Sequence, residues 1–417
     1  MCFSMRKISF FILFLFFGGI LNAQDLVEWR GPNRSGVYAD KGLLNVWPEN
    51  GPEIFLEIEG IGKGYSSPVV YHDAIYVTGT KDTINFITAY DLKGNLVWRK
   101  NFSRSSTKTY SDNRCTPTIE NNRIFLVGGN GELVCMNAMN GDIFWSKNPH
   151  KDYNGKYMGY GEVESTLLTD KAALYITGGN ETTMVALDKQ NGDLIWKSKS
   201  VGGAKSFASA SLIERNGLQI ALVQTSELLV GIDAGNGEIL WTHNLSQYHG
   251  SNRGKGEAAN VPLYNNGQIF ETYGNQQKGS MFSLSEDGRS ISLKWQNDVL
   301  DTHIGGLVLV DGNIYGSTMQ DNTNGQWASV NWETGKTNWE AEWFTKGSII
   351  SADDMLYCYD DRFGNIGLVK ANPEKFDLVG SLRIQKGAGP HWAHPTIYDG
   401  KLFVRHGDYL VIFNIKK

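Results

Sequence analysis

Cysteine and proline are scarce in this chain of 417 residues, which contains four Cys and ten Pro. Cys2 lies in an apolar N-terminal segment, so Cys115, Cys135 and Cys358 remain for the folded part. Three is an odd number and far too few for a disulfide scaffold. We expect each of these side chains to be a small buried apolar group. Stability must then come from an apolar core, which a chain of this length is able to build.

The chain also lacks a surplus of basic residues, because 39 Lys and Arg stand against 44 Asp and Glu, a formal net charge of -5. Nucleic acid is therefore an unfavourable partner, since phosphate binding needs concentrated positive charge. Beyond the N-terminus no apolar run approaches the ~18 residues of a membrane-spanning helix. We expect no transmembrane segment in the mature chain.

The N-terminus has the layout of a secretory signal peptide. Arg6 and Lys7 precede an apolar run from Ile8 to Ile20, and Leu21-Asn22-Ala23 is followed by polar residues. We predict cleavage after Ala23, so that residues 1–23 are the signal peptide and residues 24–417 form a single domain. The mature protein is expected in the periplasm or outside the cell.

Glycine, tyrosine and tryptophan are abundant, with 48 Gly, 18 Tyr and 12 Trp, which favours many tight turns and many strands. The most informative feature is a repeat in which a strand, an Asn-Gly or Asp-Gly type turn and a further strand end in Trp. The segments from Ala186 to Trp196 and from Gly231 to Trp241 match position by position in residue type. Asn-Gly turns between apolar runs are the signal of a β-hairpin. The sequence therefore predicts an all-β chain.

The closing tryptophans are 44 to 54 residues apart, close to the ~40 to 50 residues of a four-stranded propeller blade. They are Trp98, Trp145, Trp196, Trp241, Trp295 and Trp339. One blade cannot bury both of its faces, so we expect these indoles to fill the seams between neighbouring blades. The seventh repeat, from Ser348 to Gly380, lacks its Trp, and the last repeat ends before its fourth strand. The extra strand from Pro52 to Glu59 can supply that strand, which predicts an eight-bladed β-propeller of four-stranded antiparallel blades closed by an N-terminal strand.

The frame from Ala186 to Trp196 resembles the tryptophan-docking repeat of the PQQ-like, or quinoprotein alcohol dehydrogenase-like, eight-bladed propellers. Trp29-Arg30-Gly31-Pro32, Trp392-Ala393-His394-Pro395 and Arg405-His406-Gly407-Asp408 resemble a short secreted subgroup of this family. The resemblance implies one of two kinds of activity. Some members are dehydrogenases of alcohols and sugars, including polyvinyl alcohol, that depend on calcium and pyrroloquinoline quinone; others, such as BamB, are cofactor-free scaffolds for envelope proteins. Because the fold hosts both, it does not determine the activity.

The residues just before the first strand of each blade should converge on a funnel at the propeller axis, where ligands usually bind. Polar and aromatic side chains at these entrances are the candidate ligand-binding residues: Arg114, Glu162, Glu164, Lys205, Asn260, His303, Lys346, His391, Trp392 and His394. Trp392 and Trp343 fall outside the repeat frame and are the better candidates for stacking on a ligand ring. The pair His391 and His394 favours a hydrogen-bonding role over a metal site.

The quinone-dependent members imply specific roles for some of these residues. In the order of the family pattern, Glu162 (or Glu164), Asn260 and Asp301 would hold calcium, Asp301 would be the general base, and Lys346 would pair with the quinone oxygen. The chain lacks the adjacent Cys-Cys pair that many quinone-binding members have, and it has no Cys-x-x-Cys-His haem motif. Our preferred hypothesis is a propeller that binds a small polar molecule, such as a saccharide, polyol or quinone. A calcium- and quinone-dependent dehydrogenase and a BamB-like envelope scaffold are the alternatives.

Overall fold

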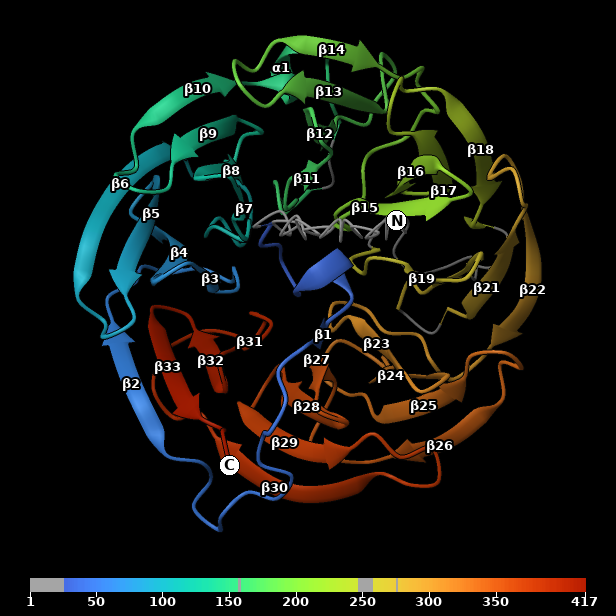
Figure 1. Cartoon of the computed structure of the whole chain (residues 1–417). Helices are drawn as coiled ribbons and strands as arrows, with labels where there is room; N and C mark the ends of the chain where they lie inside the picture. The colour runs from blue at the N-terminus through green and yellow to red at the C-terminus, as the bar shows by residue number, and fades with distance from the viewer. Residues whose placement is uncertain (1–25, 157–158, 247–257, 275–276) are drawn as a thin grey trace, which may run out of the picture.

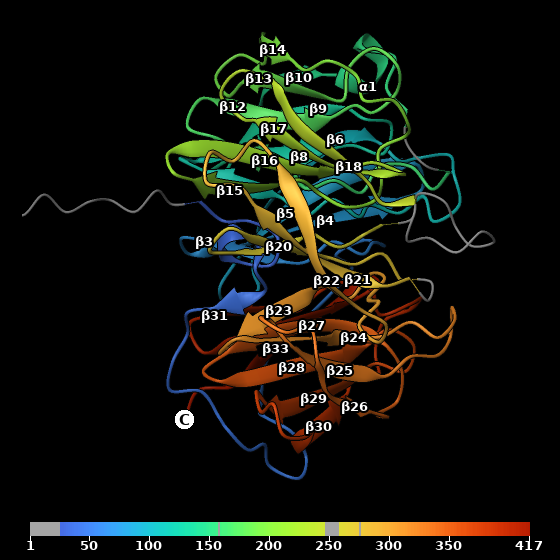
Figure 2. The same cartoon turned by 90° about the vertical axis from the view of Figure 1, so that its right-hand side faces the viewer.

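The computed structural model describes residues 26–156, 159–246, 258–274 and 277–417. The predicted signal peptide therefore lies outside the described residues. The described part of the chain forms eight antiparallel sheets arranged as blades around a central axis (Figure 1), which confirms the predicted eight-bladed propeller. Seen from the side, the ring is a short cylinder (Figure 2). No helix among the described residues is long and apolar enough to cross a membrane.

Each blade is a meander whose first strand faces the axis and whose last strand lies at the rim. Blades 1 to 4 comprise β3 (Val69–Tyr71), β4 (Ala74–Lys81), β5 (Ile84–Asp91) and β6 (Leu96–Arg104); β7 (Thr118–Glu120), β8 (Arg123–Val127), β9 (Leu133–Asn137) and β10 (Ile143–Lys147); β11 (Leu167–Leu168), β12 (Ala172–Ile176), β13 (Met184–Asp188) and β14 (Leu194–Lys197); and β15 (Ser211–Arg215), β16 (Leu218–Gln224), β17 (Leu228–Asp233) and β18 (Ile239–Asn244). A short helix α1 (Pro149–Asp152) follows β10.

Blades 5 to 8 follow the same plan. They comprise β19 (Leu263–Asn265), β20 (Gln268–Glu271), β21 (Gly279–Leu284) and β22 (Ile291–Asn297); β23 (Leu307–Val310), β24 (Asn313–Ser317), β25 (Trp327–Asn331) and β26 (Thr337–Ala341); β27 (Gly347–Ala352), β28 (Met355–Asp360), β29 (Asn365–Lys370) and β30 (Asp377–Arg383); and β31 (Thr396–Tyr398), β32 (Lys401–His406), β33 (Tyr409–Asn414) and β2 (Ile54–Glu59). The short strand β1 (Val37–Tyr38) adds in parallel to β27 of blade 7.

The ring closes through its N-terminal strand, as the sequence predicts. β2 pairs antiparallel with β33, so that Leu56 faces Ile412 and Ile58 faces Leu410. Ile58 is buried in a cluster with Ile412 and with Val70 of blade 1. The first and last parts of the chain therefore share blade 8, and no outer strand is missing from it.

The closing tryptophans lie in the seams between blades, as predicted. Trp145 and Trp196 are buried, and each packs on the turn glycine of the next blade: a Cβ atom on Gly192 would lie 2.7 Å from Trp145, and one on Gly237 would lie 2.5 Å from Trp196. Both glycines have positive φ, as a tight hairpin requires. The Nε1 of Trp145 donates to Lys189 O at 3.1 Å. Each indole therefore ties its own blade to the next.

Blade 7 lacks a closing tryptophan of its own, and Trp47 from the N-terminal segment takes its place. Gly380 has the position of the missing residue, since it pairs with Leu368 just before a register shift. A Cβ atom on Gly380 would lie 2.6 Å from the Cβ of Trp47. Trp47 is buried, and its ring contacts Tyr357 on the second strand of blade 7 with centroids 6.1 Å apart. The seventh seam is thus filled by an indole donated from outside the repeat.

The three cysteines of the described chain, Cys115, Cys135 and Cys358, are free and buried, as expected. Burial raises the pKa of the Cys115 thiol to about 12 and that of Cys358 well above its ordinary value. These thiols therefore stay protonated and belong to the core.

Candidate functional site

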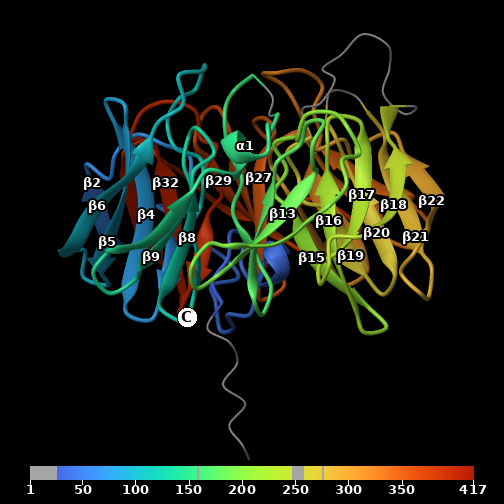
Figure 3. The same ribbon diagram turned by 90° about the horizontal axis from the view of Figure 1, so that it is seen from above.

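The axial channel is closed at one end by the N-terminal segment. The turn η1 (Pro32–Arg34) lies across the axis, on the face opposite α1 (Figures 1 and 3). Arg30 is buried and donates to Leu307 O at 2.6 Å and Ile349 O at 3.0 Å, which belong to the inner strands of blades 6 and 7. Arg34 is also buried and donates to backbone oxygens of blades 3 and 4. This segment turns the channel into a funnel with a floor.

Above this floor lies a cavity of about 400 Å³. Its aromatic lining residues are Trp29, Tyr65, Tyr110, Tyr160, Phe207 and Trp392, and its charged or hydrogen-bonding lining residues include Arg114, His303, Asn322, Lys346, Asp361 and His394. Five candidate residues from the sequence therefore meet in one cavity: Arg114, His303, Lys346, Trp392 and His394. A volume of this size suits a small ligand.

The aromatic residues form a continuous arc around one side of the funnel. The ring centroids of Tyr65 and Trp392 are 5.0 Å apart, and those of Tyr110 and Trp392 are also 5.0 Å apart. Tyr110 continues to Tyr160 at 6.1 Å, and Tyr160 to Phe207 at 5.7 Å. These contacts hold the rings in place before any ligand arrives, because each ring packs on its neighbour.

The hydrogen-bonding side of the funnel contains a buried ion pair. The Nζ of Lys346 lies 3.1 Å from Asp361 Oδ2 and donates to Asn322 O at 2.7 Å. Burial raises the pKa of Asp361, and the ammonium of Lys346 opposes that shift. The pair gives the funnel wall a fixed donor and a fixed acceptor.

His394 is held as a neutral ring near the floor. Its Nε2 lies 3.0 Å from Ile304 O, which can only accept, so Nε2 carries the proton and Nδ1 accepts from Arg30 Nη1 at 2.8 Å. Burial lowers the pKa of His394 to about 3, and Arg30 adds to this shift. Trp29 packs edge-on against the same ring at 5.1 Å.

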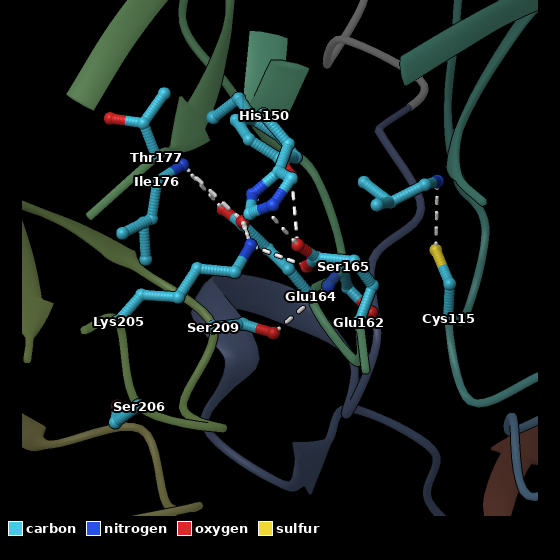
Figure 4. A network of polar contacts seen from close by, with 12 residues as sticks. Cys115, His150, Glu162, Glu164, Ser165, Ile176, Thr177, Lys205, Ser206 and Ser209 are labelled. Carbon is cyan, nitrogen blue, oxygen red and sulfur yellow. Dashed lines mark hydrogen bonds and ion pairs between the residues drawn. The ribbon is translucent and has the colours of Figure 1, made fainter. Parts of the chain in front are cut away.

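Glu162, Glu164 and Lys205 do not line the funnel; they meet in a polar network of their own (Figure 4). The Lys205 ammonium sits between the two carboxylates, in contact with Glu162 and 3.0 Å from Glu164 Oε2. Tyr175 donates to Glu162 at 2.9 Å. Burial would lower the pKa of Lys205, but the two carboxylates outweigh it and the net pKa is raised. A cation of the protein itself therefore already occupies the position between these two carboxylates.

Asn260 and Asp301 are likewise committed to the backbone. The Nδ2 of Asn260 donates to Thr302 O at 2.6 Å and to His303 O at 2.8 Å, and its Oδ1 accepts from Gly306 N at 2.8 Å. Asp301 accepts from Met319 N at 2.6 Å. Both residues shape the loops on which His303 and Met319 reach the funnel.

These contacts test whether the residues fit calcium and a quinone. Glu162 is neutralised by Lys205, the amide of Asn260 is spent on three backbone groups, and Lys346 pairs with Asp361. Within the described ranges no group of three or more His, Cys, Asp or Glu side chains could hold a metal ion. In this arrangement the residues do not provide the set of six to eight oxygen ligands, about as many as calcium takes in proteins, that would be needed to hold the ion.

His391 lies in a second cavity next to the funnel. Its Nδ1 is 2.6 Å from the Tyr359 hydroxyl, and its ring stacks on His406 at 3.6 Å. Burial lowers the pKa of His391 to about 3, and the neighbouring His406 contributes. His391 and His394 therefore face different cavities.

The comparison with protein families decides where this chain belongs. The family model described as "Outer membrane protein assembly factor BamB" matches residues 59–159 and 85–341, which is more than half of the chain. The chain belongs to the PQQ-like propeller family. A comparison with curated proteins finds no match.

Solved structures place this PQQ-like propeller among proteins of different activities. BamB from Moraxella catarrhalis is 13% identical, with a TM-score of 0.63, and the match covers 87% of this chain and 99% of that one. Quinohemoprotein alcohol dehydrogenase from Comamonas testosteroni is 10% identical, with a TM-score of 0.69, and the match covers 92% and 79%. The computationally designed Ika8 protein is 11% identical, with a TM-score of 0.61, and the match covers 88% and 100%. At these identities the likeness shows the fold alone.

Most of the aromatic arc of this PQQ-like propeller was not predicted from the sequence. Tyr65 and Phe207 stand at blade entrances, and Tyr110 and Tyr160 stand a few residues earlier. Their position at the entrances is the signal by which they could have been found. Trp343, the other suggested stacking residue, is not part of the funnel lining; it packs against Phe376 and Phe344 near the rim.

Proposed function

We propose that this PQQ-like propeller binds a saccharide or polyol in its axial funnel without converting it. The observation that supports this is the aromatic arc that includes Trp392, which lines the same cavity as a set of fixed donors and acceptors. A sugar ring has apolar C–H faces that pack on aromatic rings and hydroxyl groups that need hydrogen-bonding partners. A pre-packed arc in the same cavity as the Lys346–Asp361 pair meets both needs.

Calorimetric titration with a panel of neutral mono- and oligosaccharides and polyols tests this proposal. We expect saturable binding by at least one member and a matching rise in melting temperature, because a ligand held only by the folded state stabilises it. Trp392→Ala should weaken that binding at least tenfold. Trp343→Ala is the matched control, since it removes an indole outside the funnel, and it should leave binding unchanged. The absence of saturable binding across the panel would refute the proposal.

The dehydrogenase alternative has its own assay. Purified protein is mixed with calcium and pyrroloquinoline quinone, and dye reduction is followed with alcohols and sugars. Because the residues assigned to calcium are committed to other contacts, we expect no turnover and no change in absorbance or melting temperature. Turnover that depends on the added quinone would favour the enzyme over the binding protein.

A scaffold for envelope proteins is the second candidate function. The outermost strands expose pairs of apolar side chains at equivalent repeat positions, such as Leu96 and Val97 at 59% and 55% exposure, and Leu194 and Ile195 at 46% each. These strands also have an unpaired edge, which a peptide strand can extend. Crosslinking in envelope extracts, compared between the native chain and a Leu96→Glu/Val97→Lys variant, tests this role. The signal peptide predicted for residues 1–23 supports the periplasm or the cell exterior as the site of either function.

A further inference from the structure

A second, open cavity of about 640 Å³ lies next to the funnel, and the side chains of Arg362 and Arg383 that line it are exposed. It is lined by Arg362, Arg383, His391, His406 and the loop from Ile384 to Gly389. The two cavities share a wall, because Asp361 and Trp392 face the funnel while their chain neighbours Arg362 and His391 face the second cavity. A hydrogen bond from His391 N to Asp361 O, 3.0 Å long, ties the wall together.

The charged groups that line this cavity are all basic or imidazole groups, and no Asp or Glu is among its described lining residues. In the described part of the chain, neither Arg362 nor Arg383 has a carboxylate within 4.0 Å. Arg383 donates from Nε to Phe363 O at 3.0 Å, and no acceptor among the described residues takes up its terminal nitrogens. This concentration of positive charge stands out in a protein with a net charge of -5.

Four acidic residues that adjoin Arg362 in the sequence or contact Lys386 are engaged elsewhere. Asp361 pairs with Lys346 on the funnel side of the wall. The carboxylate of Asp360 accepts from the backbone N–H groups of Arg362, Phe363 and Asn365 in its own turn. Glu57 and Glu59 are bound by Lys386, at 3.1 and 3.6 Å. None of them neutralises the two guanidinium groups.

His406 lies at the base of the cavity and helps to shape it. Its Nδ1 lies 2.7 Å from Lys386 O, and its Nε2 lies 2.7 Å from Gly389 O. It is buried and stacks on the neutral ring of His391. The two bonds also hold the loop from Lys386 to Gly389 in place.

We infer that this cavity binds an oxyanion, namely a carboxylate, sulfate or phosphate group. Two guanidinium groups offer the planar pairs of N–H donors that match such groups. The site is separate from the proposed sugar site and stands whether or not the funnel binds a saccharide.

Titration with defined anions tests the inference. Sodium sulfate, sodium phosphate and sodium glucuronate are titrated at constant ionic strength against a sodium chloride background, with glucose as the uncharged partner of glucuronate. We expect saturable millimolar binding of at least one oxyanion. Tighter binding of glucuronate than of the inorganic anions and glucose would assign the site to an acidic sugar substituent, whereas binding of only the inorganic anions would assign it to a free anion. Both results support the inference.

The variants separate a site from a general charge effect. Arg362→Gln/Arg383→Gln should weaken oxyanion binding at least tenfold, and Arg362→Lys/Arg383→Lys, which keeps the charge, should weaken it less. Arg104→Gln/Arg289→Gln removes the same charge from exposed positions outside the cavity and should have no effect. The inference is overturned if the native protein shows no saturable oxyanion binding, or if the two Gln double variants lose equal affinity. Neutral sugar binding in the funnel should be unaffected in all variants.

Discussion

The indole of Trp47 offers a sharp test of how this ring is held together. Trp47 is only 4% exposed and packs on Gly380, at the position where the other blades carry their closing tryptophan. Truncating a buried Trp to Ala typically costs about 3 to 5 kcal/mol. The Trp47 Nε1 has no hydrogen-bond acceptor among the described residues, so the truncation also removes an unsatisfied buried donor. We therefore expect a loss of about 3 kcal/mol for Trp47→Ala, at the lower end of that range.

Trp241 provides the matched comparison. It is 7% exposed, and its Nε1 donates to Gly288 O at 3.1 Å. Its truncation loses that hydrogen bond as well, so Trp241→Ala should cost about 1 kcal/mol more than Trp47→Ala. Trp392→Ala, which acts on a half-exposed funnel residue, should cost less than either.

Urea unfolding followed by far-UV circular dichroism measures these losses, with the midpoint and the slope fitted for each variant. A rescue variant makes the test specific: Trp47→Ala/Gly380→Trp returns an indole to the position of the repeat and should recover part of the loss. The reasoning fails if Trp47→Ala is within about 0.5 kcal/mol of the native protein, or if the rescue variant is less stable than Trp47→Ala alone.

Three further predictions concern buried side chains. Burial raises the pKa of Glu271 to about 8, above its ordinary value of 4.5, so the stabilising contribution of this side chain is complete below pH 4.5 and is lost as the pH rises towards 8. The Glu271→Gln variant should therefore lose less stability than the native protein between pH 5 and pH 8, measured as urea midpoints. Equal losses in the two proteins would contradict the assignment. Lys346→Met leaves Asp361 buried without its partner and should lower the free energy of unfolding by about 3 kcal/mol. The double variant Lys346→Met/Asp361→Leu should recover most of this loss. An unstable double variant would show that the pair itself is needed. Ile58→Asp places a charge in the seam between β2 and blade 1 and should expose the N-terminal segment to limited proteolysis, whereas Glu53→Lys, at an exposed position just before β2, should not.

The fold was predictable because its rules are local and repeated. Each blade needs a tight turn and a closing indole within one short segment, as in Asn191-Gly192 and Trp196, and the pattern recurs along the chain. Counting the copies predicts the number of blades. Even the closure by β2 follows from such a count, because the last repeat is one strand short and the N-terminal segment has one strand too many.

The replacement of the seventh tryptophan was not predictable in this way. Trp47 and Gly380 lie more than 300 residues apart in the sequence, and nothing near Trp47 marks it as part of the repeat. Their contact appears only after the ring has closed, when the N-terminal segment passes the rim of blade 7. A local pattern shows that a seam lacks its indole, but it does not show which distant residue supplies one.

The candidate site was predictable in part for a related reason. Position at a blade entrance places a residue near the axis, and this was enough for Arg114, His303, Lys346, Trp392 and His394. Whether a side chain then faces the funnel depends on its partners. Glu162 and Glu164 turn to Lys205, which comes from the next blade. Such pairing depends on packing between blades and cannot be derived from the spacing within one blade.

The N-terminal segment links the stability of the ring to the shape of the funnel. Trp29 lines the cavity, Trp47 fills the seventh seam and β2 closes blade 8, so one stretch of about 35 residues serves all three. The floor is nevertheless anchored independently of the rim, because Arg30 and Arg34 bind backbone oxygens of four different blades. Since those oxygens lie in inner strands or directly before them, loosening Trp47 at the rim should destabilise the ring without displacing Trp29. Ligand affinity measured well below the unfolding midpoint should therefore be the same for Trp47→Ala as for the native protein, and a parallel loss of affinity and stability would show that the segment moves as one unit.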